Sequence, residues 1–192
     1  MGTKRVGHAR IRALINKNMN ELSFPGNGGL EAGSGFNHSD GDGSPVYISW
    51  VERFGDVIKT SVFVDLDGLM SDASGDIIGA NDQANCHIGQ HTTAKMGTLF
   101  AIKMMCVEAP TTGEPDIDLY SATEATGTEN AAVSSLTETL LIETDADWTA
   151  GAHKVAATLP ANEEYFYLVA SGGGTAAEYG SGKFIIEFWG KA

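Results

Sequence analysis

Acidic side chains in two glycine-containing loops are the first residues of this sequence that could bind a metal ion. The loop NHSDGDGSP carries Asp40 and Asp42, and the stretch DLDG carries Asp65 and Asp67. If Asp40 and Asp42 took the third and fifth positions of an EF-hand loop, His38 would take the first, where a carboxylate is required. The spacing therefore favours solvated turns with Asx hydrogen bonds, and a non-standard calcium site is the alternative.

A second group of candidate metal ligands is Cys86, His87 and His91 in NCHIGQH, with Cys106 farther along the chain. Structural zinc needs four converging ligands, and the sequence has no paired C-x-x-C spacing. Alternation along a strand would also send Cys86 and His87 to opposite faces. We therefore predict buried free thiols and surface histidines, with no metal and no cofactor.

Paired acids and tryptophans are the remaining candidates for chemistry. Asp116 and Asp118 alternate with Ile117 and Leu119, which predicts a solvated strand face for the two carboxylates. The sequence contains no G-x-S-x-G elbow, dinucleotide fingerprint or recognisable nucleophile–base pair, so we predict that the protein is not an enzyme. Among the tryptophans, Trp148 in the polar stretch DADWTAG is the one predicted to meet a ligand if any does.

Period-two alternation of apolar residues predicts β-structure after residue 46. Residues 58–66 alternate as a half-buried strand would, and TLFAIKMMCVE is apolar on both faces, as in a central strand. The stretches DIDLYSA, TETLLIET, EYFYLVAS and KFIIEFWG follow, separated by polar turns, and TENAAVSSLTETL predicts a helical turn or a long loop. The pattern predicts an all-β fold, a jelly-roll-like β-sandwich over residues 46–192.

The N-terminal segment differs from this body in pattern and in charge. It holds five of the chain's 12 Lys and Arg residues and has no acid before Glu21, although the whole chain has a net charge of −13. Apolar residues at helical spacing predict a basic amphipathic helix over residues 1–23, followed by a Gly-rich linker over residues 24–45. The residues predicted to make contacts with a partner or another copy are Lys4, Arg5, Arg10, Ile11, Arg12, Leu14, Ile15, Lys17, Asn18, Met19 and Leu22.

The overall charge and hydropathy narrow the range of partners. A net charge of −13 disfavours nucleic acid and anionic membranes as partners of the whole molecule. The apolar runs are shorter than a membrane span requires, and no hydrophobic stretch of a secretion signal follows the basic N-terminus. We therefore expect no nucleic-acid partner, no membrane partner and no secretion signal.

Several stretches carry a resemblance to a known family: KRVGHARIRALI at the start, IGQHTTAKMGTLF and GEPDIDLYSATEATGTENAAVSSLTETLLI in the middle, and DWTAG and EYFYLVASGGGTAAEYGSGKFIIEFWG towards the end. In these stretches the chain resembles small virion structural proteins, similar to head-decoration proteins, of marine tailed bacteriophages, including cyanophages. The resemblance covers most of the chain except residues 24–56. It implies a virion component present in many copies, and it supplies no catalytic residues.

The residues and the resemblance together predict a capsid decoration (cement) protein on the exterior of the virion. We expect a homo-trimer that binds the major capsid protein through its N-terminal helix, with the acidic β-sandwich projecting outward. The alternative is a tail-fibre or adsorption component whose β-sandwich binds glycans near Trp148. An enzyme that hydrolyses glycans is the third reading, without a recognisable catalytic pair behind it.

Overall fold

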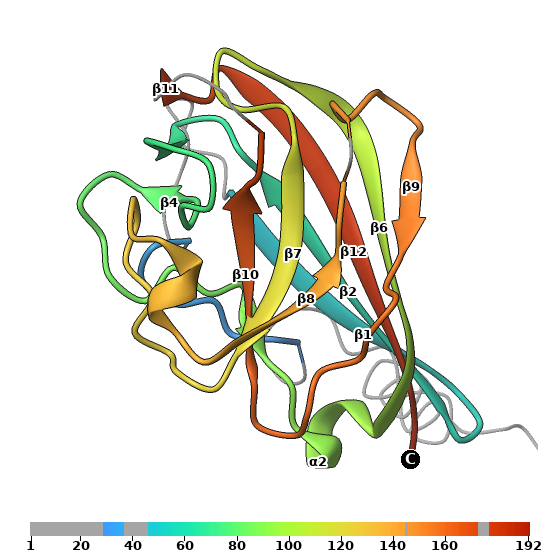
Figure 1. Ribbon diagram of the computed structural model, residues 1–192. Coiled ribbons are helices and arrows are strands. Elements are labelled where there is room, and N and C mark those ends of the chain that lie inside the picture. Colours follow the sequence, from blue (N-terminus) through green and yellow to red (C-terminus); the bar gives the residue numbers. More distant parts are fainter. Residues whose placement is uncertain (1–28, 37–45, 145, 173–176) are drawn as a thin grey trace, which may run out of the picture.

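The computed structural model describes residues 29–36, 46–144, 146–172 and 177–192, and this part of the protein is built from antiparallel β-strands (Figure 1). Helical structure in these ranges is limited to the short helix α2 (Thr93–Met96) and one turn of 3-10 helix (Val133–Ser135). The 3-10 turn lies in TENAAVSSLTETL, where the sequence predicts a helical turn or a loop. The predicted all-β fold is confirmed.

The larger sheet has five strands in the order β1-β2-β12-β6-β9, each antiparallel to its neighbours. The hairpin between its first two strands turns at Gly55, whose φ of 66° suits glycine. The last described strand, β12, lies between β2 and β6, which are the two longest of the other strands in this sheet. The strands are β1 (Tyr47–Phe54), β2 (Val57–Asp65), β12 (Ser181–Lys191), β6 (Thr98–Thr111) and β9 (His153–Val155).

A four-stranded sheet in the order β5-β10-β7-β8 lies against the five-stranded sheet, and a small third sheet has the order β11-β3-β4 (Figure 1). The predicted strands DIDLYSA, TETLLIET and EYFYLVAS correspond to β7, β8 and β10. The bounds are β5 (Gly89–Gln90), β10 (Tyr165–Ala170), β7 (Ile117–Ala122) and β8 (Glu138–Ile142), then β11 (Ala177–Glu178), β3 (Leu69–Ser71) and β4 (Gly79–Ala80).

Strand pairs between distant parts of the chain are nested. β2 pairs with β12, β5 with β10, β6 with β9, and β7 with β8. In sequence, the two strands of each pair lie outside the two strands of the next pair. Successive pairs alternate between the five-stranded and the four-stranded sheet. The described chain therefore follows the path of one long hairpin folded across two sheets.

A single hydrophobic core lies between the two large sheets. Alternation in β2 points Val62 and Val64 into this core, as predicted, and both side chains are fully buried. From the opposite sheet, the ring of Phe166 lies 4.4 Å from the ring of Phe188, measured between centroids. Burying side chains of this size contributes about 1.5–3 kcal/mol each to stability, so the two sheets hold each other in place.

Residues 29–36 belong to the β body, which corrects the prediction of a linker for these residues, whereas the rest of the predicted linker over residues 24–45 lies outside the described residues. Phe36 is fully buried in the core. The glycines that suggested a flexible linker instead allow close packing here, because a Cβ on Gly35 would lie 2.3 Å from the sulfur of Cys86. Glycine-rich composition alone therefore does not distinguish a linker from a tightly packed segment.

Candidate interaction surface

One face of the five-stranded sheet points away from the core and carries large apolar side chains; we call it the outer face. The strand registers place Ile48, Phe63, Ile185 and Met105 in one row across β1, β2, β12 and β6. Side chains two residues away along each strand share the same face. The large apolar residues of the outer face are Ile48, Trp50, Phe54, Phe63, Met105, Val155, Ile185 and Trp189.

Several of these side chains are open to solvent in the described structure. Phe54 is 57% exposed and Val155 is 61% exposed. Phe100 and Val107, at 54% and 50%, are the residues left without partners where the register between β6 and β12 shifts. The apolar row itself is partly open, because Ile48 is 39% exposed and Phe63, Ile185 and Met105 are half-buried. Large apolar side chains left open on a sheet face mark sites of association, so the outer face is the candidate functional surface.

The charged residues within the outer face include an ion-paired cluster around Lys59. Lys59 forms ion pairs with Glu52 at 2.5 Å and with Glu187 at 3.6 Å, and its ammonium lies 5.6 Å from the ring centroid of Trp189. The hydrogen bond to Glu52 raises the pKa of Lys59. Lys59 offsets one of its two carboxylate partners, which lowers the net charge beside the apolar row that a partner would have to desolvate.

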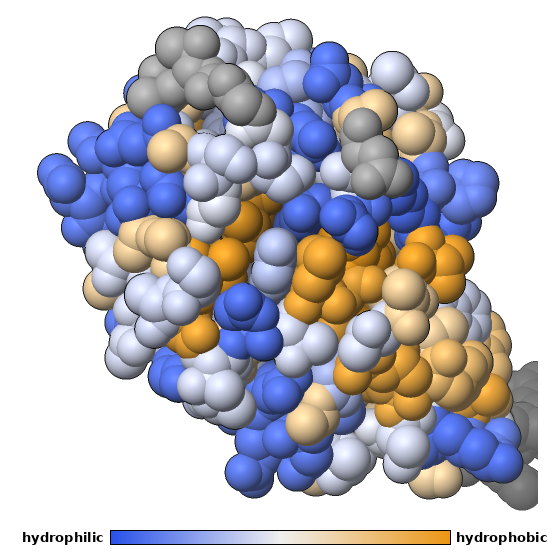
Figure 2. Space-filling model, in the orientation of Figure 1, coloured by the Kyte–Doolittle hydropathy of each residue, from blue (hydrophilic) through white to orange (hydrophobic). Residues whose placement is uncertain are grey.

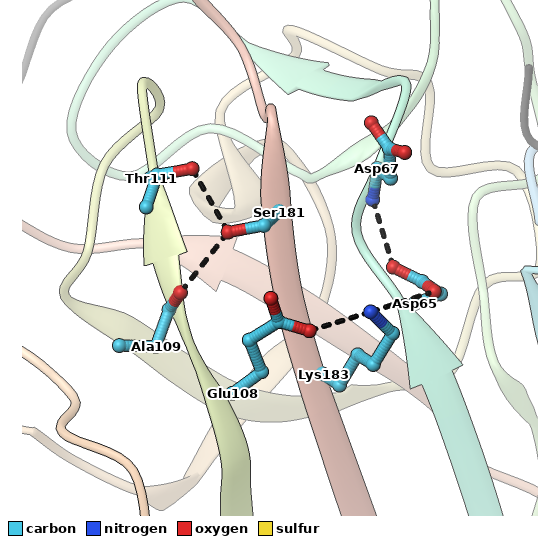
Figure 3. A network of polar contacts seen from close by, with 7 residues as sticks. All are labelled: Asp65, Asp67, Glu108, Ala109, Thr111, Ser181 and Lys183. Carbon is cyan, nitrogen blue, oxygen red and sulfur yellow. Dashed lines mark hydrogen bonds and ion pairs between the residues drawn. The ribbon is translucent and has the colours of Figure 1, made fainter.

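A second polar network closes one end of the outer face (Figure 3). Lys183 on β12 forms ion pairs with Glu108 at 2.5 Å and Asp65 at 3.6 Å, which connects β6, β12 and β2. The hydrogen bond to Glu108 raises the pKa of Lys183. The Asp65 carboxylate also accepts a hydrogen bond from the backbone N–H of Asp67 at 3.2 Å. The DLDG stretch is therefore an Asx turn, as the sequence favours, with its first carboxylate held by a lysine.

Apolar surface also extends round the edge of this sheet. Figure 2 views the molecule from the side of the four-stranded sheet and shows hydrophobic residues over the region where Figure 1 draws β9 and the lower part of β6. Val155 in β9, Leu159 just after it and Phe100 near the start of β6 are exposed large apolar residues of this region. A partner that covers the outer face could therefore also contact this edge.

The interface residues predicted from the sequence lie outside the described residues, together with the predicted helix over residues 1–23. The loop NHSDGDGSP also lies outside them, so its alternative as a calcium site stays a prediction. The residues concerned in the N-terminal segment are Lys4, Arg5, Arg10, Ile11, Arg12, Leu14, Ile15, Lys17, Asn18, Met19 and Leu22.

Trp148 is not a surface contact, which corrects its assignment as the tryptophan available to a ligand. Its side chain is 3% exposed, and its ring lies 5.4 Å from Phe184 in an edge-to-face arrangement. Its indole N–H donates a 2.8 Å hydrogen bond to the carbonyl of Ile117. The tryptophans that lie on a sheet face outside the core are Trp50 and Trp189.

The carboxylate of Asp118 is also buried, although the sequence predicts a solvated face. It is 4% exposed and accepts hydrogen bonds from the backbone N–H of Thr144 at 2.7 Å and from its hydroxyl at 2.8 Å. Asp116 accepts from the same hydroxyl. Burial raises the pKa of Asp118. The pair therefore fixes the chain that follows β8 and does not form an open catalytic dyad.

Both cysteines and one of the described histidines are packed in the interior. Cys86 and Cys106 are buried free thiols, as predicted. The prediction of surface histidines is wrong for His91, which is 3% exposed with Nδ1 2.9 Å from the carbonyl oxygen of Ala161. Within the residues that the structure describes, no three His, Cys, Asp or Glu side chains converge as metal ligands.

Comparison with protein-family models, with curated proteins and with solved structures gave no match. In the described ranges, no helix combines the length and the apolarity that crossing a membrane would require.

Sequence reasoning missed the outer face, although one signal for it was present. TLFAIKMMCVE is apolar on both faces, which predicts a central strand, and β6 does lie between β12 and β9. In the structure, Ile102 and Met104 face the core, whereas Met105 and Val107 lie on the other side of β6. An apolar pattern on both faces of an antiparallel strand is also the pattern of a strand with an interaction surface.

Proposed function

We propose that this protein is a structural component of a bacteriophage virion: a capsid decoration (cement) protein on the capsid exterior, and not an enzyme. The observation that carries the proposal is the outer face, a sheet surface with exposed apolar side chains and locally paired charges. Such a surface suits permanent association in a larger assembly. The resemblance of the sequence to virion structural proteins supports the same conclusion.

We further propose that the described fold is a jelly roll. The support is the nesting of the strand pairs β2–β12, β5–β10, β6–β9 and β7–β8, because a jelly roll is a folded double sheet of eight strands. Jelly rolls occur in viral capsid proteins and in lectins, so the fold is compatible with a virion role and does not by itself decide it.

The proposed anchor to the major capsid protein is the basic N-terminal segment, as a helix over residues 1–23. Its five cations would meet acidic groups of the shell, and its apolar stripe would supply the buried contact. The acidic charge of the rest of the chain would keep neighbouring protein bodies soluble and apart from nucleic acid.

Deleting residues 1–22 is expected to abolish binding to purified capsids and to leave a folded β body. The reason is that the deletion removes the proposed anchor and none of the residues of the described core. Co-sedimentation with particles measures binding, and circular dichroism measures folding. Replacing both Lys154 and Lys191 with alanine is the control, because it removes two cations from the body. Equal binding of the truncated and full-length proteins would refute the anchor.

We propose that the outer face joins copies of the chain into a homo-trimer. Phe54→Glu and Val155→Glu are expected to lower self-association at least tenfold, because each change places a charge in the interface. Their effect on the free energy of unfolding of the monomer should stay within about 0.5 kcal/mol, because both side chains are more than half exposed. Sedimentation equilibrium measures the association. Glu178→Lys in β11, outside the outer face, is the control.

The second candidate is a tail-fibre or adsorption component that binds glycans. Trp148 cannot be its glycan contact as predicted, because this side chain is buried. Mass spectrometry of purified particles separates the two candidates. Many copies of this chain per particle would favour decoration of the head, whereas a few copies would favour the tail.

A further inference from the structure

A cavity on the side of the β body is not used by the proposed assembly function. It has a volume of about 450 Å³ and lies between the segment 29–36, the chain on both sides of β5, and the start of β10. This volume falls within the range of about 300–1,000 Å³ that is usual for small-molecule sites. Polar and aromatic side chains on its wall include Glu31, Ser34, His87, Thr92, Lys95 and Tyr165.

The wall of the cavity is held by close backbone packing. The N–H of Gly33 donates a 2.9 Å hydrogen bond to the carbonyl of His87. A Cβ on Gly33 would lie 1.8 Å from the carbonyl oxygen of Asn85, so only glycine fits there. Asn85 itself has a φ of 57°, a left-handed conformation that Asn adopts more readily than most residues. The cavity is therefore built by specific backbone geometry of two separate segments.

Two polar atoms of the wall are buried without a hydrogen-bond partner. They are Nδ1 of His87 and the hydroxyl oxygen of Thr92. Burial lowers the pKa of His87, so the imidazole is neutral at neutral pH and offers one donor and one acceptor. Unpaired buried polar groups are unfavourable. Both atoms are covered in this structure, so a ligand in the cavity would pair with them only after Thr92 and His87 change rotamer, and that pairing would remove the cost.

The remaining groups of the wall limit the chemistry of a ligand. Lys95 and Glu31 are exposed and carry opposite charges, so the cavity has no excess of cations for a phosphate or carboxylate. Tyr165 adds an aromatic ring, which lies 4.9 Å from the ring of His87 between centroids. An uncharged molecule with several hydroxyl groups and an apolar C–H face matches this set of groups.

We propose that this cavity binds a sugar residue of a glycan. Tyr165 would contact the C–H groups of the sugar ring, and Thr92, His87, Glu31 and Lys95 would hydrogen-bond to its hydroxyl groups. This inference is independent of attachment to the capsid, because it involves neither residues 1–22 nor the outer face. A virion protein with such a site would bind the particle weakly to glycan-coated surfaces.

The test begins with the full-length protein on a printed glycan array. The best-bound oligosaccharide is then titrated calorimetrically into the protein and two variants. Thr92→Val removes the unpaired hydroxyl from the cavity and keeps the side-chain shape. Thr60→Val is the matched control, because Thr60 also has a buried hydroxyl without a partner but does not line the cavity.

We expect Thr92→Val to lower the affinity for the oligosaccharide about 3- to 10-fold, which is the effect of losing one hydrogen bond. Thr60→Val should leave the affinity unchanged. Thermal unfolding of both variants confirms that they remain folded. No saturable binding of the full-length protein to the array would overturn the proposal. Equal loss of affinity in the two variants would also overturn it, because the sugar would then bind elsewhere.

Discussion

Trp148→Ala is expected to lower the free energy of unfolding by about 3–5 kcal/mol, the range for removing a large buried aromatic side chain. The change leaves a cavity beside Phe184 and removes the shorter of two side-chain hydrogen bonds to the carbonyl of Ile117. Urea unfolding followed by circular dichroism measures the loss. Trp148→Phe should lower the free energy of unfolding by less, because an aromatic ring remains next to Phe184.

Phe100→Ala is the matched control for this experiment. Phe100 is also aromatic but is 54% exposed, so its removal should change the free energy of unfolding by about 0.5 kcal/mol or less. If the two alanine variants lost the same stability, Trp148 would not be part of the core. A ligand role for Trp148 would then be open again.

The second large effect is expected at Asp118. Asp118→Ala should cost about 2–3 kcal/mol, because it leaves the buried backbone N–H of Thr144 without its acceptor. Asp118→Asn keeps an oxygen at that position, so its cost at pH 7 should stay below about 1 kcal/mol. Denaturant unfolding at pH 7 separates the two variants. Equal losses would show that the charge of the carboxylate, and not its acceptor oxygen, stabilises the fold.

The same residue predicts a dependence of stability on pH. Burial raises the pKa of Asp118 above its ordinary value of 3.8, so the folded protein keeps this proton to a higher pH than the unfolded chain. The contribution of this group to stability therefore falls as the pH rises from about 3.8 through the folded-state pKa. In Asp118→Asn this fall should be absent. Unfolding curves of both proteins between pH 4 and pH 7 measure the difference.

Strands with a regular apolar alternation were predictable from the sequence, and strands of two or three residues were not. The alternation in β2 and the apolar runs of β7, β10 and β12 identify their elements because each contains several residues that face the core. β5 and β9 are too short to show a period, so only their pairing with longer strands defines them.

The burial of Asp118 and Trp148 could not be predicted, because it depends on segments far away in the sequence. Asp118 lies on the side of β7 that alternation assigns to solvent, but the chain after β8 covers it through Thr144. Trp148 has polar neighbours in sequence, whereas its partners in space are Ile117 and Phe184. The local sequence pattern predicts on which face of the sheet a side chain lies. It does not predict which distant segment packs over that face.

The position of β12 has a consequence for how the protein is made. This strand pairs along its length with both β2 and β6, so the larger sheet cannot close until β12 has left the ribosome. Contacts across such a long span of sequence form slowly, and a chain interrupted during synthesis would expose the edges of β2 and β6. A chain that stops before β12 therefore cannot form the larger sheet and should be degraded.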